Sequence, residues 1–292
     1  AWGSEALMEG NRVIGVTFQS KEGRKAILAG KVIDCTGDGD IFASAGCAYE
    51  KEYSGDDRSY NVSVVFRLGN VDSEEFRNWK YDPNSHYRDK LAEYKKLFGY
   101  RISPFVTPMK DIMWVNNFVE GKDCCNVQDL TDTEMLIRRS LNEGIEWIRE
   151  NVPGFKNAFL HDTAPQLGTR GSRRLNGTYR LTMDDIAQTI EHEDTIAIIP
   201  AHRRMKYKSP IELPYGVMLP ADDVEDLLAA GRCFSSAHDA NDHANLIPHC
   251  VALGEAAGAA AALALQSNTT FRNVDVKKVQ QMLKKQGVYL PR

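Results

Sequence analysis

The stretch that decides the fold is Val32-Ile33-Asp34-Cys35-Thr36-Gly37-Asp38-Gly39-Asp40, a short apolar strand that runs directly into glycine. A second stretch far along the chain, Leu228-Ala229-Ala230-Gly231-Arg232-Cys233, has the same form. Glycine after a strand permits a sharp turn and lets a ligand approach the backbone closely. We therefore expect the two stretches to form two parts of one ligand site.

A run of small residues follows the second stretch after a polar loop. It reads Ala252-Leu253-Gly254-Glu255-Ala256-Ala257-Gly258-Ala259 and predicts a helix that opens near Leu253 and Gly254. The N–H groups at a helix start attract negative charge, so this opening could face a ligand. The alternative is that the small residues only let the helix pack tightly against a sheet.

Hydrophobic periodicity predicts the elements that flank these stretches. Alternating residues indicate strands at 11–19 and 25–29, and apolar residues at helical spacing indicate helices at 131–151 and 275–286. Residues 211–220 mix proline and glycine with apolar residues, which favours a connection that crosses the surface.

The positions of the two glycine stretches suggest a domain organisation. If they share a ligand, residues 1–50 and 211–292 form one domain. Residues 51–210 then form an inserted substrate or cap domain. Within that insertion, the predicted loop at His202-Arg203-Arg204 is expected to be solvated.

Composition excludes several classes of protein. The chain has 292 residues, of which 42% are hydrophobic and 26% charged, so it can build a sizeable core. Its net charge of −4 argues against a nucleic-acid-binding surface. No stretch approaches the ~20 apolar residues of a membrane helix. Without a signal peptide or a Cys-x-x-Cys pair, we expect a reduced, cytoplasmic protein.

Three blocks of the sequence, residues 31–50, 165–182 and 211–266, together resemble a known family. They look like the FAD-dependent oxidoreductases of the glutathione-reductase-type flavoprotein superfamily, near the fumarate-reductase-like flavoproteins. The resemblance implies an α/β fold and FAD as cofactor. A partial FAD-binding Rossmann-like domain would be interrupted by a mixed α+β substrate/cap domain.

The resemblance also implies which residues hold FAD. One group lies near the dinucleotide part and the other beside the ribityl and isoalloxazine. Asn245 stands where relatives tend to carry arginine, so a contact to substrate or flavin is altered there. The implied cofactor-binding residues are Cys35, Thr36, Gly37, Asp38, Gly231, Arg232, Asn245, Leu253, Gly254 and Gly258.

One feature of the family is missing from this sequence. Its members begin with a strand and a Gly-x-Gly-x-x-Gly turn that holds the pyrophosphate, followed by an acidic residue for the ribose. This chain has neither. We expect that it is a fragment, or that a partner chain supplies this segment, and that the chain alone binds FAD weakly or not at all.

The polar loop from Ala237 to His249 holds three histidines and two aspartates. Flavin oxidation of an alcohol or amine needs a nearby base, and histidine titrates in the right range. We therefore predict His238, His243 and His249 as catalytic residues. The alternative for each is capping or hydrogen bonding within the loop.

The stretch Arg170-Gly171-Ser172-Arg173-Arg174 is a dense basic patch. Arginine can clamp a carboxylate in bidentate fashion, so we predict that Arg173 handles the substrate. The alternative is salt bridging between domains.

Three functions remain open at this point. The first is an oligomeric FAD-dependent oxidoreductase that transfers hydride between a small organic substrate and flavin N5. The second is a non-catalytic subunit or truncated domain that needs a partner chain to bind FAD. The third is a metal-dependent hydrolase using the histidine loop, although no His-Glu-x-x-His spacing is present and no metal is expected.

Overall fold

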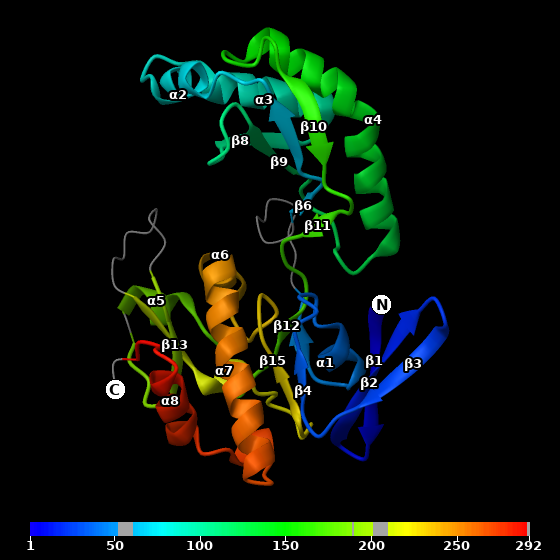
Figure 1. The fold of residues 1–292 in the computed structure, drawn as a ribbon, viewed down its shortest axis with the longest axis vertical. Coiled ribbons are helices and arrows are strands. Elements are labelled where there is room, and N and C mark those ends of the chain that lie inside the picture. The colour runs from blue at the N-terminus through cyan, green and yellow to red at the C-terminus, as the bar shows by residue number, and fades with distance from the viewer. Residues whose placement is uncertain (52–60, 189, 201–209, 291–292) are drawn as a thin grey trace. The chain divides into compact units, whose positions relative to one another are not determined.

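The computed structural model describes residues 1–51, 61–188, 190–200 and 210–290. The predicted loop at His202-Arg203-Arg204 lies outside these residues. Figure 1 shows a mixed α/β chain built from several small sheets and helices.

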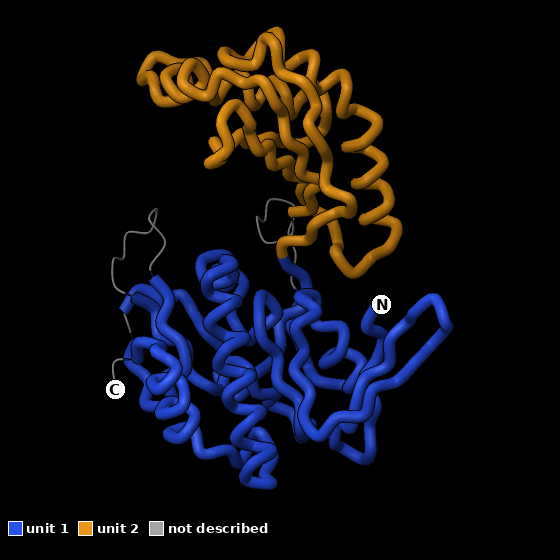
Figure 2. Tube along the Cα trace, in the orientation of Figure 1, with its two compact units in different colours: residues 1–52, 171–292 blue, residues 53–170 orange. Residues whose placement is uncertain are grey.

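The chain forms two compact units, coloured separately in Figure 2. Unit 1 comprises residues 1–52 and 171–292, and unit 2 comprises residues 53–170. Unit 2 is therefore an insertion in unit 1. The chain returns to unit 1 at Gly171, well before the boundary expected at residue 210.

Unit 1 begins with an antiparallel sheet of three strands, β1 (Trp2–Glu9), β2 (Arg12–Ser20) and β3 (Gly23–Leu28). The strands expected at 11–19 and 25–29 are confirmed, whereas β1 was not expected. Alternate residues of β2 are buried, which is the pattern of a strand with one face on a core.

The next strand, β4 (Val32–Asp34), pairs in parallel with β15 (Leu227–Ala229). The register places Val32 opposite Leu227 and Asp34 opposite Ala229. The convergence expected of the two glycine stretches is therefore confirmed for the strands that precede them. Figure 1 shows β4 and β15 side by side, although they come from opposite ends of the sequence.

The β4–β15 pair lies between two layers. On one face, Leu228 and Ala230 belong to a core shared with α7 (Ile247–Gln266). On the other face, Val32 and Leu227 belong to a core shared with the three-stranded sheet and with α1 (Asp40–Ser44). Alternation of side chains along each strand produces this division.

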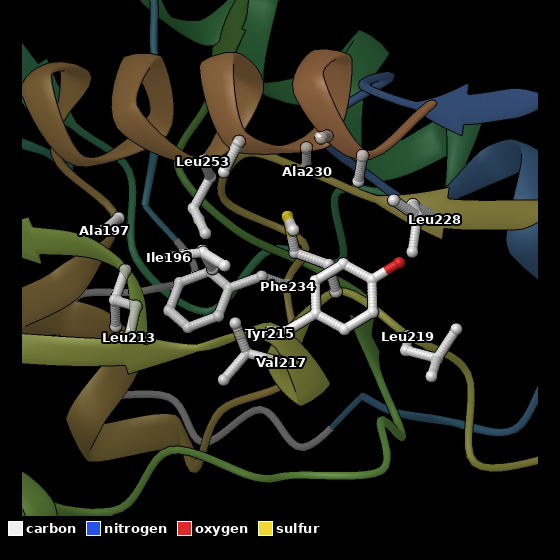
Figure 3. Close-up of a cluster of buried hydrophobic side chains, with 14 of the residues drawn as sticks. Ile196, Ala197, Leu213, Tyr215, Val217, Leu219, Leu228, Ala230, Phe234 and Leu253 are labelled. Atoms are coloured by element: carbon white, nitrogen blue, oxygen red, sulfur yellow. The ribbon is translucent and has the colours of Figure 1, made fainter. Parts of the chain in front are cut away.

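Residues 211–220 are not a surface connection, so that expectation is wrong. All ten are buried, and the segment begins with β14 (Ile211–Pro214), which pairs antiparallel with β13 (Thr195–Ile199). A short helix, η2 (Tyr215–Val217), follows. Figure 3 shows Leu213, Tyr215 and Val217 within the buried cluster. Here proline and glycine end a core strand.

Two helices replace the polar loop that we expected before the small-residue run. These are α6 (His238–Ala244) and α7, which begins at Ile247 with Pro248 in its first turn. The prediction that the helix opens near Leu253 and Gly254 is therefore wrong. Proline is favoured in the first turn of a helix because an N–H at that position has no acceptor within the helix, so its absence costs nothing.

Unit 1 is completed by α5 (Met183–Gln188), η3 (Phe271–Asn273) and α8 (Val276–Lys285). The helix expected at 275–286 is confirmed. The Asp275 side chain accepts hydrogen bonds from two backbone N–H groups of its first turn, and Val279 and Leu283 are buried.

Unit 2 contains a four-stranded antiparallel sheet and three helices. The strand order is β10-β7-β9-β8. The helix expected at 131–151 is α4, which starts four residues earlier because the Asn126 side chain caps it. The strands are β7 (Phe66–Gly69), β8 (Arg101–Val106), β9 (Met113–Phe118) and β10 (Phe159–Thr163). The helices are α2 (Ser73–Tyr81), α3 (Tyr87–Phe98) and α4 (Val127–Asn151).

Two short strand pairs occur where the chain passes between the units. In unit 1, β5 (Tyr49–Glu50) pairs antiparallel with β12 (Arg174–Leu175). In unit 2, β6 (Val62–Ser63) pairs antiparallel with β11 (Gly168–Thr169).

Among the described residues, α7 alone is long and apolar enough to cross a membrane by length and composition. The core helix of a folded domain meets the same criterion. Seven residues of α7 are buried, among them Leu253, Ala256 and Ala260, which belong to the core shared with β15. A membrane span is therefore not indicated.

Candidate functional site

The two glycine turns leave the same end of one parallel strand pair. The backbone N–H of Ala230 donates to the carbonyl of Asp34 at 2.9 Å, so the strands stay paired up to the turns. Gly37 and Gly231 then adopt φ values of 84° and 103°, which non-glycine residues rarely reach. In open parallel sheets, ligands bind beyond the carboxyl ends of the strands.

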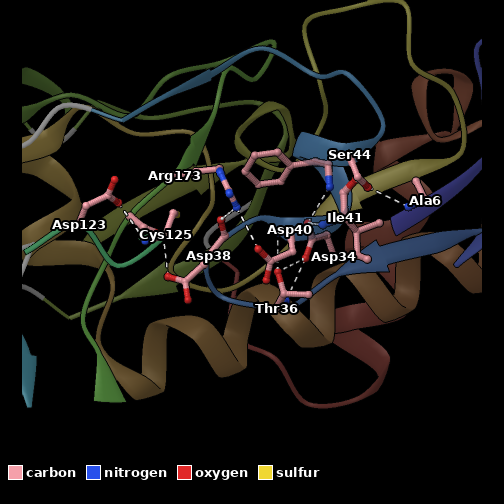
Figure 4. A network of polar contacts seen from close by, with 12 residues as sticks. Ala6, Asp34, Thr36, Asp38, Asp40, Ile41, Ser44, Asp123, Cys125 and Arg173 are labelled. Atoms are coloured by element: carbon pink, nitrogen blue, oxygen red, sulfur yellow. Dashed lines mark hydrogen bonds and ion pairs between the residues drawn. The ribbon is translucent and has the colours of Figure 1, made fainter. Parts of the chain in front are cut away.

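Asp34 organises the first turn. Its carboxylate accepts hydrogen bonds from Thr36 N (2.9 Å), Thr36 Oγ1 (2.7 Å), Ile41 N (3.0 Å) and Phe42 N (2.9 Å). The residue is fully buried. Figure 4 shows Asp34 with Thr36 and Ile41 around it. One side chain therefore fixes both arms of the turn that contains Gly37 and Asp38.

Arg232 connects the two turns. Its Nη2 lies 2.9 Å from Oδ1 of Asp38, and the same oxygen accepts a hydrogen bond from Ser172 Oγ at 2.6 Å. A Cβ added to Gly37 would lie 2.3 Å from Nη1 of Arg232. Glycine is therefore needed at position 37 for its backbone conformation and for the space that the guanidinium fills.

Arg173 binds the chain itself. Its Nη1 donates to the carbonyl of Asp38 at 3.0 Å and to Oδ1 of Asp40 at 2.9 Å, as Figure 4 shows. Its guanidinium carbon lies 5.6 Å from the centre of the Tyr49 ring, a cation–π contact. The structure thus places Arg173 in contacts within unit 1.

Three cysteines lie close to the two turns, and none is in a disulfide. Although Cys35 is exposed as a whole, its thiol is partly desolvated, which raises its pKa, and the nearby Asp34 and Cys250 raise it further. Burial also raises the pKa of Cys250, while Arg232 lowers it. The pKa of the completely buried Cys233 is raised well above its usual value. Helix α7, whose first turn contains Cys250, contacts β4.

Asn241 ties α6 to the second turn. Its side-chain N–H groups donate to the carbonyl of Arg232 at 3.0 Å and to Ser236 Oγ at 2.8 Å. Asn245 in turn donates to Oδ1 of Asn241 at 3.0 Å, and its carbonyl accepts from the Cys250 thiol at 3.5 Å. Asn245 therefore links the end of α6 to the start of α7.

The small residues of α7 lie in the middle of the helix and not at its start. Leu253 is fully buried and belongs to the core. Gly254 and Gly258 have no heavy atom within 4 Å of the position that a Cβ would take. These two glycines leave space along the outer side of α7, so a planar cofactor could approach this helix closely. The residues present at the site fit a bound FAD in this respect.

The three predicted histidines occupy different positions. His238 begins α6 and His243 lies in its last turn, both half-buried, while His249 is buried in the first turn of α7. The described residues contain no group of three or more His, Cys, Asp or Glu side chains that could hold a metal ion.

Two pockets occur in unit 1, one at the opposite end of the strand pair from the two turns and one beside the Arg173 side chain that binds the first turn. One of about 430 Å³ is lined by Lys31, Asp226 and Thr269, at the amino ends of β4 and β15. Another of about 460 Å³ lies beside Tyr49 and Arg173.

Comparison with known proteins shows the class of protein. A family model described as FAD dependent oxidoreductase matches residues 1–283. The chain therefore belongs to the FAD-dependent oxidoreductase family, and FAD is the cofactor that defines this family. We found no match among curated proteins.

One solved structure is similar to this chain. It is a triple mutant of the flavin-dependent brominase Bmp2, with 12% sequence identity and a TM-score of 0.41. The similarity covers 97% of this chain and 54% of the brominase chain. The chain thus spans about half the length of that structure.

Sequence reasoning missed three residues of the site, Asp34, Ser172 and Asn241. Asp34 carried a signal, because a buried strand that ends in a single acidic residue needs hydrogen-bond donors for it. Ser172 and Asn241 carried none, since their partners lie on segments far away or on backbone carbonyls.

Proposed function

We propose that this protein is a flavin-dependent oxidoreductase that binds FAD beyond the carboxyl ends of β4 and β15. The observation that carries the proposal is the parallel pairing of these strands, which brings the turns at Gly37 and Gly231 to the same edge. When bound, FAD would exchange a hydride at its N5 atom with a small organic substrate. Unit 1 would then be the Rossmann-like cofactor domain and unit 2 the substrate domain.

The residues proposed to hold FAD fall into three groups. Cys35 to Asp38 would contact its dinucleotide part, Gly231 and Arg232 its ribityl chain, and Gly254 and Gly258 would let the flavin lie close to α7. Open space over the two helix glycines and the positive φ of the turn glycines support this assignment. Leu253 would support the flavin site indirectly, because its side chain is buried in the core.

His238 is the proposed base. It starts α6, whose Asn241 bonds to the carbonyl of Arg232, so α6 and the second turn are held together. A neutral imidazole there would accept the proton that leaves a substrate hydroxyl or amine. His243 and His249 would be secondary partners, and Arg173, which binds Asp38 and Asp40, would support the site.

The test uses the full-length protein. It should purify yellow or bind added FAD, and His238→Ala should lose turnover about 100-fold or more while keeping FAD. His161→Ala in unit 2 is the matched control, because His161 is an exposed histidine on β10. Unchanged turnover in His238→Ala would remove His238 from the reaction. Absence of FAD binding by the protein together with the segment or partner chain that completes the site would overturn the proposed function.

A second proposal concerns how FAD binding is completed. Val32 and Asp34 make their backbone hydrogen bonds toward β15, so the N–H and C=O of Ile33 point to the opposite edge of β4. No strand of the described residues pairs there. We propose that a further segment, in this protein or in a partner chain, adds to this edge and supplies the phosphate-binding glycine turn. Copurification followed by mass spectrometry would identify it.

A further inference from the structure

We propose that Asp34 is the positioning residue of the FAD site, acting through the turn that it holds. This inference rests on the proposed function, because the turn from Cys35 to Asp38 is a proposed cofactor contact. Asp34 itself is fully buried and would touch neither FAD nor substrate.

The hydrogen bonds of Asp34 define the shape of the turn. Oδ1 receives two bonds from Thr36, on the arm that leaves β4. Oδ2 receives bonds from the backbone N–H groups of Ile41 and Phe42, on the arm that enters α1. Gly37, Asp38 and Gly39 lie between the two arms. One carboxylate therefore sets the separation of the arms and the path of these three residues.

The side chains of Asp34 and Thr36 cap the start of α1. Its N-cap residue is Gly39, which offers no side chain, so Asp34 reaches from β4 to satisfy the first N–H groups of the helix. Thr36 strengthens the arrangement, because its Oγ1 also accepts from Asp40 N at 2.9 Å. Removing the Asp34 carboxylate would release both arms at once.

Asp226 provides a matched control at the opposite end of the same strand pair. It is also a buried carboxylate, and it binds Lys31 Nζ at 2.6 Å and Arg12 Nε at 2.9 Å. Its partners are side chains, and neither belongs to the turn from Cys35 to Asp38. Asparagine tolerates the left-handed conformation of this position, where φ is 62°.

The experiment compares Asp34→Asn with Asp226→Asn in the full-length protein. Asparagine keeps the size of the side chain but replaces one acceptor oxygen with an NH2 group, so two donors face each other in the turn. We would measure the Kd for FAD by flavin fluorescence, at a temperature at which circular dichroism shows both variants folded. Asp34→Asn should weaken FAD binding about tenfold or more, and Asp226→Asn by less than about threefold.

A second pair of variants keeps the test valid if Asp34→Asn does not fold. Thr36→Val removes the hydroxyl that donates to Asp34, whereas Thr36→Ser keeps it, so Thr36→Val should bind FAD about threefold to tenfold more weakly than Thr36→Ser. Visible circular dichroism of the bound flavin should differ between the two variants.

The outcomes are distinct. If the wild type binds FAD, and the variants at Asp34 or Thr36 bind it no more weakly than Asp226→Asn, the positioning function of Asp34 is overturned and the proposed function stands. If the wild type binds no FAD even together with the segment or partner chain that completes the site, both proposals fail.

Discussion

The two ends of the β4–β15 strand pair each contain a buried aspartate, but the two carboxylates are satisfied in different ways. Asp226, at the amino end, binds the side chains of Lys31 and Arg12. Asp34, at the carboxyl end, binds three backbone N–H groups and one hydroxyl of its own turn. A carboxylate bound by distant side chains holds segments together, whereas one bound by nearby backbone groups fixes a local conformation.

The largest effect on stability is expected at the amino end. Asp226→Ala should lower the free energy of unfolding by about 3–5 kcal/mol, because it leaves a buried lysine without its acceptor. The side chain of Lys31 is only 9% exposed. Urea unfolding followed by circular dichroism measures this loss. Arg12→Ala is the control, and since that side chain is 53% exposed it should cost less than about 1 kcal/mol.

Asp34→Ala should cost about 1–3 kcal/mol, since the N–H groups of Ile41 and Phe42 lose their acceptor. The loss is smaller because Asp34→Ala leaves neutral N–H groups without an acceptor, whereas Asp226→Ala leaves the charge of Lys31 without one. The same urea experiment applies. A larger loss for Asp34→Ala than for Asp226→Ala would break the comparison between the two ends.

Gly37→Ala tests what the first turn contributes to stability at the carboxyl end of the strand pair. The left-handed backbone alone should cost about 1–2 kcal/mol, and displacement of Arg232 should add to this. Gly46→Ala is a matched control, because Gly46 has φ of 85° and open space around its Cβ position. Equal losses of unfolding free energy in the two variants would show that the contact with Arg232 contributes nothing.

The smallest effect is expected on the rate at which the Cys35 thiol is alkylated. The raised pKa of Cys35 predicts slow alkylation near neutral pH, with a rate that increases as the pH rises above about 9. Asp34→Asn removes a negative charge that raises this pKa, so alkylation of Cys35 should become faster, and Asp226→Asn should leave it unchanged. Mass spectrometry after iodoacetamide treatment measures both rates.

Buried thiols also make stability depend on pH. Burial raises the pKa of Cys47 from 9.0 to about 12, so the folded state holds this proton more tightly than the unfolded state. The stabilisation is fully present below pH 9 and is lost as the pH rises toward 12. Cys47→Ala should therefore flatten the fall in unfolding free energy between these values, which urea titrations at several pH values would measure.

Local sequence patterns predicted those helices and strands whose signal lies within their own residues. The strand at 32–34 and the helix at 275–286 were both predicted, because a short apolar run and apolar residues at helical spacing are local signals. The convergence of the two glycine stretches followed from their similar form, whereas the parallel pairing of β4 with β15 was not predicted. The family also followed from the sequence, and the match over residues 1–283 confirms it.

The remaining features depend on contacts that no local pattern encodes. Leu253 and Gly254 were read as a helix start because small residues suggested a ligand, but the Leu-Ile-Pro sequence before them begins α7 at Ile247. Residues 211–220 were read as exposed because proline and glycine usually mark loops, yet their apolar side chains fill the core. The contacts of Arg173 with Asp38 and Asp40 depend on segments more than a hundred residues away.

The pairing of β5 with β12 has a consequence for how this architecture can vary. The chain leaves unit 1 beside Glu50 and comes back beside Arg174, which is the residue paired with Glu50. The two points of insertion are therefore neighbours, whatever the inserted segment contains. Exchange of that segment for another of different size would demand little extra loop-closure entropy. Recombination at this strand pair is thus a simple route by which unit 1 can receive a different inserted unit.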